Sequence, residues 1–470
     1  MLQKLNRETA GIKQTHPVKV LQFGDGNFIR GFIDWIIDIL NEKTNFNGAV
    51  QIIRPLRNNK EVKYLEQDGL YHVAQRGLLN GKTISETRLI TCVKDAIHPY
   101  LEFQRFLKSG ENPDLQFIFS NTTEAGIVFN PHDTNVYSIP ESFPGKLTLL
   151  LFHRFNHFNK ESTRGLILIP CELIEKNGDT LRAIILQYVS HWNLPDDFKD
   201  WILQHNTFCN TLVDRIIPGF PKDAAAEIQE SIGYEDTQMV MAEPYHLLVI
   251  EAPEEVRKLF PTEQVGLNLK FVPDLTPYRI RKVRILNGAH TTLVPVAYLR
   301  GLRTVKESVN DPYVSEFLRK AIHEEIIPTL DLLEDELKQF AADVIERFQN
   351  PFIKHELISI ALNSISKFKV RVLPTILEYE KRTGKLPERL LQSLAALLVF
   401  YKGNWKGESI PLKDSPDILN FFKETWEANQ PEVVVQKVLA NSSFWGCDLN
   451  QIKGLSELVT RQVKDLIASN

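Results

Sequence analysis

The strongest constraint on the fold is a strand, a glycine turn and a helix that follow one another near the N-terminus. Val18–Phe23 is a short apolar run, Gly24-Asp25-Gly26 follows it, and apolar residues then recur at helical spacing from Phe28 to Leu40. Glycines let the backbone approach a phosphate, and the N-terminus of a helix offers free N–H groups. The segment therefore predicts a docking site for a dinucleotide pyrophosphate. A simple tight turn is the alternative, because Ile29 occupies the usual place of a third glycine and the next glycine is Gly31.

Further strand and helix patterns alternate over the first half of the chain. We expect buried strands at 49–53, 115–120 and 165–170, with helices at 100–108 and 147–158. Such alternation predicts a mostly parallel sheet with crossover helices. Two β-rich runs flank Asn80-Gly81 within Tyr71–Arg88, which predicts a hairpin as an antiparallel extension of that sheet.

The pattern becomes helical from Thr276 onward. Thr276-Pro277 is a typical N-cap and first-turn pair for a long helix that Pro295 should kink and Gly301 should stop. Further helices are expected at 312–326, 330–347, 352–366, 369–381, 387–401, 416–427, 431–440 and 454–468. The fold class is thus α/β, with a Rossmann-like dinucleotide-binding domain over residues 1–272 and a mostly helical substrate-binding domain over 273–470.

Composition excludes several classes of partner. There are 55 Lys and Arg residues and 59 Asp and Glu residues, so the net charge of −4 gives no reason to expect a nucleic acid or an anionic membrane. The four cysteines are far apart and form no CxxC pair, so we expect neither disulfides nor a metal site. Without a signal peptide or an apolar run that could span a bilayer, a cytoplasmic protein is expected.

Lys282, Asn287 and His290 form the candidate catalytic set. At about 100° per residue of α-helix, these three side chains project from one side. The reduction of a ketone needs a proton donor, which a lysine can supply, and a donor to the developing oxyanion, which an asparagine can supply. Histidine can orient a substrate hydroxyl. Alternatively, Asn287-Gly288 marks a helix defect and His290 is structural.

The residues after the second strand leave the choice of nucleotide open. A carboxylate at this position would hold the ribose of NAD, but the sequence continues into Arg54-Pro55-Leu56-Arg57. Basic residues there suit the 2′-phosphate of NADP, or they are simply solvated.

These motifs resemble the mannitol dehydrogenase family of long-chain, metal-independent polyol dehydrogenases. FGDGNFIRGFIDW (23–35) is similar to the family's cofactor segment, and KVRILNGAH (282–290) is similar to its Lys-x4-Asn-x2-His signature. NTTEAG (121–126) and TLVDRI (211–216) are further similar stretches, so the resemblance spans nearly the whole chain. It implies a Rossmann domain, a helical substrate domain, NAD without zinc, and Lys282 as general acid/base. The candidate cofactor-binding residues are Phe23, Gly24, Gly26, Asn27, Phe28, Arg30, Arg54, Asn121 and Glu124.

Within the family, stretches such as IPCELIEKNGD and NPFIKHELISIALNSISKF are similar to members that reduce hexuronates. This similarity implies reversible, NADH-dependent reduction of D-tagaturonate to D-altronate. Two positions depart from the mannitol-type pattern, since Leu173 replaces an asparagine that helps to hold the oxyanion, and Arg279 replaces a glutamate. An arginine could pair with a substrate carboxylate, or it could lie exposed on the first helical turn.

Four other residues are weaker candidates. Asp214 is either a carboxylate of the substrate cleft or half of an interface salt bridge, and Lys354 and Lys367 either assist the substrate carboxylate or are solvated. Glu124 follows a sheet strand, where it could contact the cofactor or cap the next helix.

Four other functions stay open. They are fructuronate reduction, mannitol- or arabinitol-type polyol oxidation, an NADP enzyme acting on another keto sugar, and a non-catalytic sugar-acid sensor that keeps the fold. The oligomeric state is not predicted.

Overall fold

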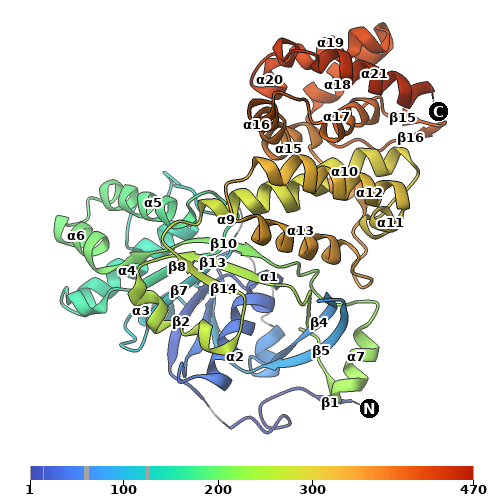
Figure 1. Cartoon of the computed structure of the whole chain (residues 1–470). Helices are drawn as coiled ribbons and strands as arrows, with labels where there is room; N and C mark the ends of the chain where they lie inside the picture. Colours follow the sequence, from blue (N-terminus) through green and yellow to red (C-terminus); the bar gives the residue numbers. More distant parts are fainter. Residues whose placement is uncertain (1, 14, 58–62, 123–125, 469–470) are drawn as a thin grey trace. The chain divides into compact units, whose positions relative to one another are not determined.

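The computed structural model of the 470-residue chain describes residues 2–13, 15–57, 63–122 and 126–468. The chain divides into two compact units. The first comprises Met1–Arg76 and Thr83–Leu275, and the second comprises Gly77–Lys82 and Thr276–Asn470. The first unit contains the main sheet, whereas the second is mostly helical (Figure 1).

A parallel sheet of six strands forms the centre of the first unit. Its order is β6-β3-β2-β7-β8-β9. The bounds are β2 (Val18–Phe23), β3 (Ala49–Ile53), β6 (Val93–Ile97), β7 (Phe117–Ser120), β8 (Ile167–Pro170) and β9 (Thr207–Phe208). The order reverses between β2 and β7, and ligands of open α/β sheets bind beyond the carboxyl ends of the strands at such a reversal. The predicted parallel sheet is confirmed.

Helices connect most of these strands, as predicted, and the first unit has further helices after β9. In the first unit they are α1 (Asn27–Ile29), the π-helical η1 (Arg30–Asp34), α2 (Trp35–Lys43), α3 (Phe103–Gly110), α4 (Phe143–His157), α5 (Asn177–His191), α6 (Asp196–His205), α7 (Ala225–Ile232) and α8 (Glu254–Leu259), with 3₁₀ segments at Lys63–Gln67, Ser162–Arg164 and Thr262–Val265. The elements α1, η1 and α2 form one continuous run, so the expected helix after the glycine turn is present.

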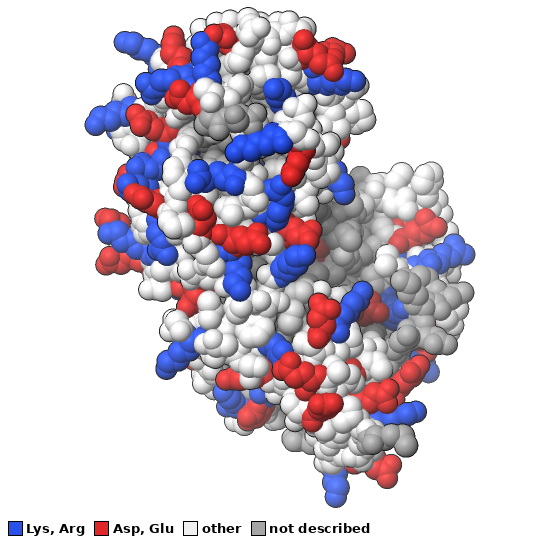
Figure 2. Space-filling view, turned by 90° about the vertical axis from the view of Figure 1, so that its right-hand side faces the viewer, with Lys and Arg blue, Asp and Glu red and all other residues white. Residues whose placement is uncertain are grey.

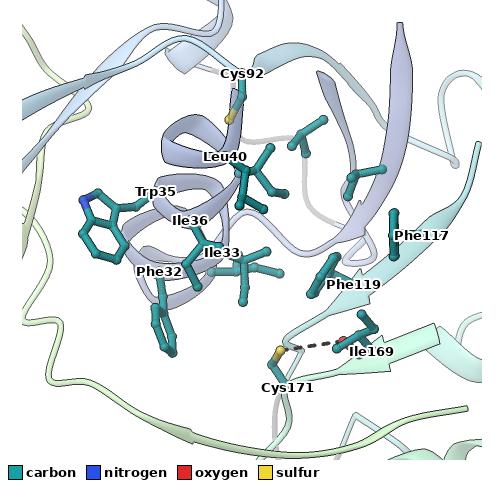
Figure 3. Packing of buried hydrophobic residues seen from close by; sticks show 14 of the residues in the cluster. Phe32, Ile33, Trp35, Ile36, Leu40, Cys92, Phe117, Phe119, Ile169 and Cys171 are labelled. Carbon is teal, nitrogen blue, oxygen red and sulfur yellow. Dashed lines mark hydrogen bonds between the residues drawn. The ribbon is translucent and has the colours of Figure 1, made fainter. Parts of the chain in front are cut away.

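Each face of the sheet is covered by its own apolar core. Successive side chains of a strand point to opposite faces. Val20 and Phe119 accordingly belong to the core on one face, and Leu21 and Ile118 belong to the core on the other. Figure 3 shows the first core, where apolar residues of the helical run after the turn, such as Ile36, lie opposite the strand residues. Burial on both faces explains why the strands are almost continuously apolar.

Gly31, in the π-helical turn η1, is closely packed by other segments. A side chain at Gly31 would place its Cβ 3.0 Å from Val240 and 3.1 Å from Ile217. The third glycine of a dinucleotide turn normally permits this kind of close helix packing. In this chain the glycine at the close contact is therefore Gly31, within η1, while Ile29 enters the core.

The predicted hairpin exists, but its expected place in the main sheet is wrong. β4 (Tyr71–Leu79) and β5 (Lys82–Ile90) flank Asn80 and Gly81, whose φ angles of 53° and 73° suit the turn that this dipeptide favours. β4 pairs in parallel with β12 (Val240–Ala242) in a separate sheet of three strands. The partner lies far along the chain, where no local pattern identifies it. The other strands are β1 (Gln3–Lys4), β10 (Asn210–Asp214), β11 (Tyr234–Glu235), β13 (Leu247–Glu251), β14 (Leu269–Val272), β15 (Asn404–Trp405) and β16 (Glu408–Ser409).

The second unit begins with the predicted long helix. It consists of α9 (Thr276–Arg281), the π-helical η5 (Lys282–Asn287) and α10 (Gly288–Leu299), and it ends before Gly301 at a φ of 92°. The remaining helices are α11 (Val305–Asn310), α12 (Pro312–Lys320), the π-helical η6 (Ala321–Ile326), α13 (Glu334–Phe348), α14 (Leu357–Ile360), α15 (Ser364–Arg371), α16 (Leu373–Thr383), α17 (Glu388–Phe400), α18 (Pro416–Ala428), α19 (Pro431–Ala440), α20 (Ser442–Trp445) and α21 (Leu455–Ala468), with 3₁₀ segments at Ile327–Thr329 and Leu449–Gln451. The helices expected at 352–366 and 369–381 are wrong in their bounds, because α15 runs across the expected break.

Charged side chains of both signs are interspersed on the face shown in Figure 2, as the near-balanced composition suggests. Over the described ranges, no helix has the length and apolar character needed to cross a membrane.

Candidate active site

The glycine turn ties together the ends of three neighbouring strands. The Gly24 N–H donates to the Ile53 carbonyl at 3.0 Å, and the Asn121 N–H donates to the Phe23 carbonyl at 3.1 Å. Gly24 has a φ of 118°, and a Cβ there would lie 2.9 Å from the Asn121 carbonyl oxygen. Only glycine fits this position without strain, so the turn is built for a close approach of the backbone.

A cavity of about 350 Å³ opens beside this turn. Its lining includes Gly24, Gly26, Arg54 and Asn121, four of the predicted cofactor-binding residues. The cavity lies where the strand order reverses and where the helical run from Asn27 begins. These features match the site of a dinucleotide pyrophosphate in open α/β sheets.

Four other predicted cofactor-binding residues, Phe23, Asn27, Phe28 and Arg30, lie on the elements directly before and after the glycine turn. The Arg30 guanidinium donates to the Asp25 carbonyl, the Gln238 carbonyl and the Asn27 Oδ1 atom at 2.9–3.2 Å. Phe23 and Phe28 pack their rings into the cores. The interactions of these four side chains hold the shape of the turn, and none of the four lines the cavity. Glu124 lies outside the described residues.

Arg54 is neither solvated nor unpaired. Its guanidinium Nε lies 3.0 Å from the Asp25 carboxylate, and only 8% of its side chain is exposed. The second strand thus ends in an arginine whose charge is already balanced by a carboxylate from the glycine turn. Both residues line the cavity.

Asp34, at the end of η1, is a buried acid close in the chain to the glycine turn. The Asp34 carboxylate accepts a hydrogen bond from the Tyr71 hydroxyl at 2.7 Å, and its Oδ1 atom has no hydrogen-bond partner in the described part of the chain. Gln22 interacts with Asp34. The Gln22 Nε2 atom donates to the Gly24 carbonyl at 3.2 Å, and the Gln22 Oε1 atom has no hydrogen-bond partner among the described residues. Burial raises the pKa of Asp34 to about 7. A protonated Asp34 needs fewer hydrogen-bond donors than a carboxylate, which fits the unpartnered Oδ1 atom.

Asp34→Asn should therefore remove a pH dependence of stability. Because the folded pKa of about 7 exceeds the ordinary 3.8, the native state holds this proton and loses stability as the pH rises toward 7. Wild type should lose roughly 2 kcal/mol more of its unfolding free energy between pH 5.5 and pH 8.5 than the variant does. Denaturant unfolding at both pH values measures this difference. The exposed Asp114→Asn change is the control, and parallel wild-type and Asp34→Asn curves would contradict the assignment.

In the second unit, the predicted catalytic residues lie on the π-helical turn and just after it. The Gly288 N–H donates to the carbonyl of Val283, five residues earlier. In this winding, residues five apart lie one turn apart, so Lys282 and Asn287 lie closer on one face than α-helical winding would place them. Both side chains are half-buried. π-bulges in helices are frequent at functional sites.

Helix α15 packs against this turn. The Arg284 guanidinium donates to the Val370 carbonyl at 2.7 Å. A Cβ at Gly288 would lie 3.4 Å from the Arg371 carbonyl oxygen, which is ordinary van der Waals contact, so the end of α15 packs directly against this part of the helix. The π-helical turn is therefore tied to the backbone of a second helix by its own Arg284 side chain.

His290 is a neutral imidazole with an unsatisfied nitrogen. Its ring stacks on Phe348, with centroids 4.1 Å apart, and meets the ring of His355 edge-on at 5.1 Å. Burial and the charges of His355, Arg347, Arg371 and Lys367 hold the pKa of His290 well below 6.5. Its buried Nε2 atom has no hydrogen-bond partner among the described residues. A substrate hydroxyl would satisfy this atom.

The other predicted substrate residues differ in their surroundings. Lys367 is half-buried within electrostatic reach of His290, and its Nζ donates to the Ile360 carbonyl at 2.8 Å. Lys354 is 79% exposed and pairs with Glu356 at 3.2 Å. Arg279 is half-buried on α9, and Asp214 is buried at the end of β10 in the first unit.

Sequence reasoning missed three residues around His290, namely Arg347, His355 and Arg371. Arg371 follows Lys367 by four residues, which is a recognisable helical spacing. The expected helix break between residues 366 and 369 concealed it.

Comparisons with known proteins identify the family. The mannitol dehydrogenase Rossmann domain matches residues 18–263, and the mannitol dehydrogenase C-terminal domain matches residues 274–467. Altronate oxidoreductase of Yersinia enterocolitica is 45% identical over 100% of this chain and 98% of its own length. Altronate oxidoreductase of Bacillus subtilis is 46% identical over 97% of this chain and 94% of its own length.

Solved structures show the same fold. Mannitol 2-dehydrogenase of Pseudomonas fluorescens, in a ternary complex with NAD and D-mannitol, superposes with a TM-score of 0.73 at 21% identity, covering 99% of this chain and 97% of that one. A substrate-free D-sorbitol dehydrogenase superposes with a TM-score of 0.83 at 20% identity, covering 99% and 98%. The resemblance drawn from the glycine-turn and lysine motifs is confirmed: the chain belongs to the mannitol dehydrogenase family.

Proposed function

We propose that this protein catalyses the reversible, NADH-dependent reduction of D-tagaturonate to D-altronate. The observation that carries the proposal is the 44–46% identity, over nearly the full length, to altronate oxidoreductases of several bacteria. The orphaned His290 nitrogen amid cationic groups supports a hydroxylated, anionic substrate. A cytoplasmic location fits the four free cysteines, and it belongs to the same proposal.

The two halves of the chain have separate tasks in this proposal. Residues 1–272 hold NADH, whose pyrophosphate lies against Gly24 and Gly26, and residues 273–470 hold the sugar acid. The cavity beside the turn and the glycine that a Cβ would obstruct support the first assignment. The half-buried polar face of η5 supports the second.

The chemistry of the second unit is a proton transfer with stabilisation of an oxyanion. NADH, when bound, supplies the hydride to the carbonyl carbon. The Lys282 ammonium protonates the forming alkoxide, and the Asn287 amide donates a hydrogen bond to the same oxygen. His290 forms a hydrogen bond with a neighbouring hydroxyl of the substrate, as acceptor or as donor. This hydrogen bond fixes the orientation of the carbon chain of the substrate. Hydride and proton together convert the ketone into the alcohol.

The Asp25–Arg54 pair should set the preference between the two nucleotides. With its charge balanced, Arg54 offers a 2′-phosphate little attraction. Asp25→Asn keeps the shape and removes the charge, so kcat/KM for NADPH relative to NADH should rise about tenfold, the scale of one charge-assisted hydrogen bond. Steady-state kinetics with both nucleotides measure the ratio. Glu141→Gln removes a different carboxylate of the same cavity as the control, and an unchanged ratio in Asp25→Asn would contradict the role of the pair.

The proposed function is tested by following NADH and NADPH consumption with D-tagaturonate, D-fructuronate and D-fructose. Fastest turnover of D-tagaturonate with NADH is the expected result. Preference for D-fructuronate would reassign the substrate, and preference for D-fructose would make the protein a polyol dehydrogenase. Binding of D-tagaturonate without any turnover would favour the sensor.

A further inference from the structure

Helix α15 carries two cations one helical turn apart. Lys367 and Arg371 are both half-buried, and neither forms an ion pair in the part of the chain that the structure describes. Lys367 donates to a backbone carbonyl, and one guanidinium nitrogen of Arg371 lies 3.5 Å from the Thr291 hydroxyl oxygen. Like charges four residues apart destabilise a helix. Partly buried cations without an anion are costly, so the pair is arranged for something other than stability.

The end of α15 is held at the catalytic helix. Arg284 donates a hydrogen bond to the carbonyl of Val370, and the carbonyl of Arg371 packs against Gly288. The Arg371 guanidinium lies 3.5 Å from the hydroxyl of Thr291, the residue after His290. These contacts fix the guanidinium beside the residues that act on the substrate.

Electrostatics place both cations in the same surroundings as His290. Lys367 and Arg371 act on the imidazole with like sign, and Arg371 also acts on Lys367. The carboxylate that offsets Lys367, that of Asp414, accepts a hydrogen bond from the Tyr401 hydroxyl. The unsatisfied Nε2 atom of His290 and two cations that form no ion pair among the described residues therefore lie in one region.

We propose that Arg371, with Lys367 beside it, binds the carboxylate of the substrate and thereby selects sugar acids over neutral keto sugars. The inference rests on the proposed function. A guanidinium can bind a carboxylate through two parallel hydrogen bonds, and a lysine adds a point charge. A neutral sugar offers the two cations no anion. In this arrangement the substrate carboxylate, which is far from the ketone, binds to the two cations, and this binding energy serves to position the ketone.

Arg371→Met tests the proposal, because it keeps much of the side-chain volume and removes the charge. Loss of a charged hydrogen-bond partner should lower kcat/KM for D-tagaturonate about 30-fold or more, mainly through KM. The kcat/KM for D-fructose, which has no carboxylate, should change little. Arg371→Lys should restore part of the loss. Lys369→Met removes a cation two residues away, on another side of the same helix, and should leave both substrates unaffected.

Several outcomes would overturn the proposal. Equal losses for D-tagaturonate and D-fructose in Arg371→Met would indicate a general structural role. If Arg279→Met loses the preference for D-tagaturonate over D-fructose and Arg371→Met keeps it, the substrate carboxylate binds at Arg279 on α9 instead. If the wild-type protein turns over neither D-tagaturonate nor D-fructuronate, the proposed function itself is refuted. If the wild-type protein reduces D-tagaturonate and Arg371→Met does so with the same kinetics, this inference alone is refuted.

Discussion

Lys282→Ala is expected to reduce kcat for D-tagaturonate about 10³-fold. General acid catalysis by a positioned side chain contributes roughly 10²–10⁴-fold, and the alanine variant leaves the alkoxide without its proton donor. Binding of NADH, which we assign to the first unit, should be unchanged. Stopped-flow absorbance gives the rate of the chemical step, and nucleotide fluorescence gives the binding constant.

A chemical rescue makes this test specific. Small primary amines such as methylamine should restore part of the rate in Lys282→Ala, because they can replace the missing proton donor. The exposed Lys306→Ala change is the matched control and should leave kcat unaltered. Normal turnover in Lys282→Ala would show that another group protonates the alkoxide.

Asn287→Ala is expected to reduce kcat about 10²–10³-fold, the usual effect of removing one donor to an oxyanion. KM should change little, because the amide acts on charge that develops only in the transition state. The backbone carbonyl of Asn287 accepts a hydrogen bond from the Thr291 hydroxyl at 2.9 Å, and the substitution leaves that contact in place. The melting temperature should therefore be close to that of wild type.

Asn287→Asp is a stricter test of the role of the Asn287 amide. A carboxylate at this position would repel the developing alkoxide, so this variant should be slower than Asn287→Ala although it is closer in shape. The opposite order, or an effect confined to KM, would contradict a role in stabilising the oxyanion.

Much of the fold could be predicted because its signals are local. The run Val18–Phe23, the glycine turn and the following helix each carry a recognisable period or conformational preference, and the structure has them at the expected residues. The same holds for the helix start at Thr276 and its end before Gly301.

The rest depends on contacts that no local pattern contains. The π-helical turn η1 contains Gly31, which Val240 and Ile217 approach closely, and η5 is tied to α15 by the hydrogen bond from Arg284 to the Val370 carbonyl. The partner of β4 lies in a strand far along the chain. The sequence also could not show that Arg54 is paired with Asp25, since the two residues are brought together only by the parallel pairing of β2 and β3.

The candidate site was predicted as a set of residue types, and its electrostatics came from the fold. The spacing of Lys282, Asn287 and His290 indicated the chemistry, but Phe348 and His355 on other segments make the imidazole of His290 neutral and leave its nitrogen unsatisfied. The roles of these residues stay predictions that the variants above address.

The most direct test of the central claim is the oxidative reaction of the wild-type protein with NAD⁺, in which the appearance of NADH is followed with D-altronate and, separately, with D-mannitol. We predict that D-altronate is oxidised with the higher kcat/KM. Faster oxidation of D-mannitol, or no NADH from D-altronate, would contradict the account.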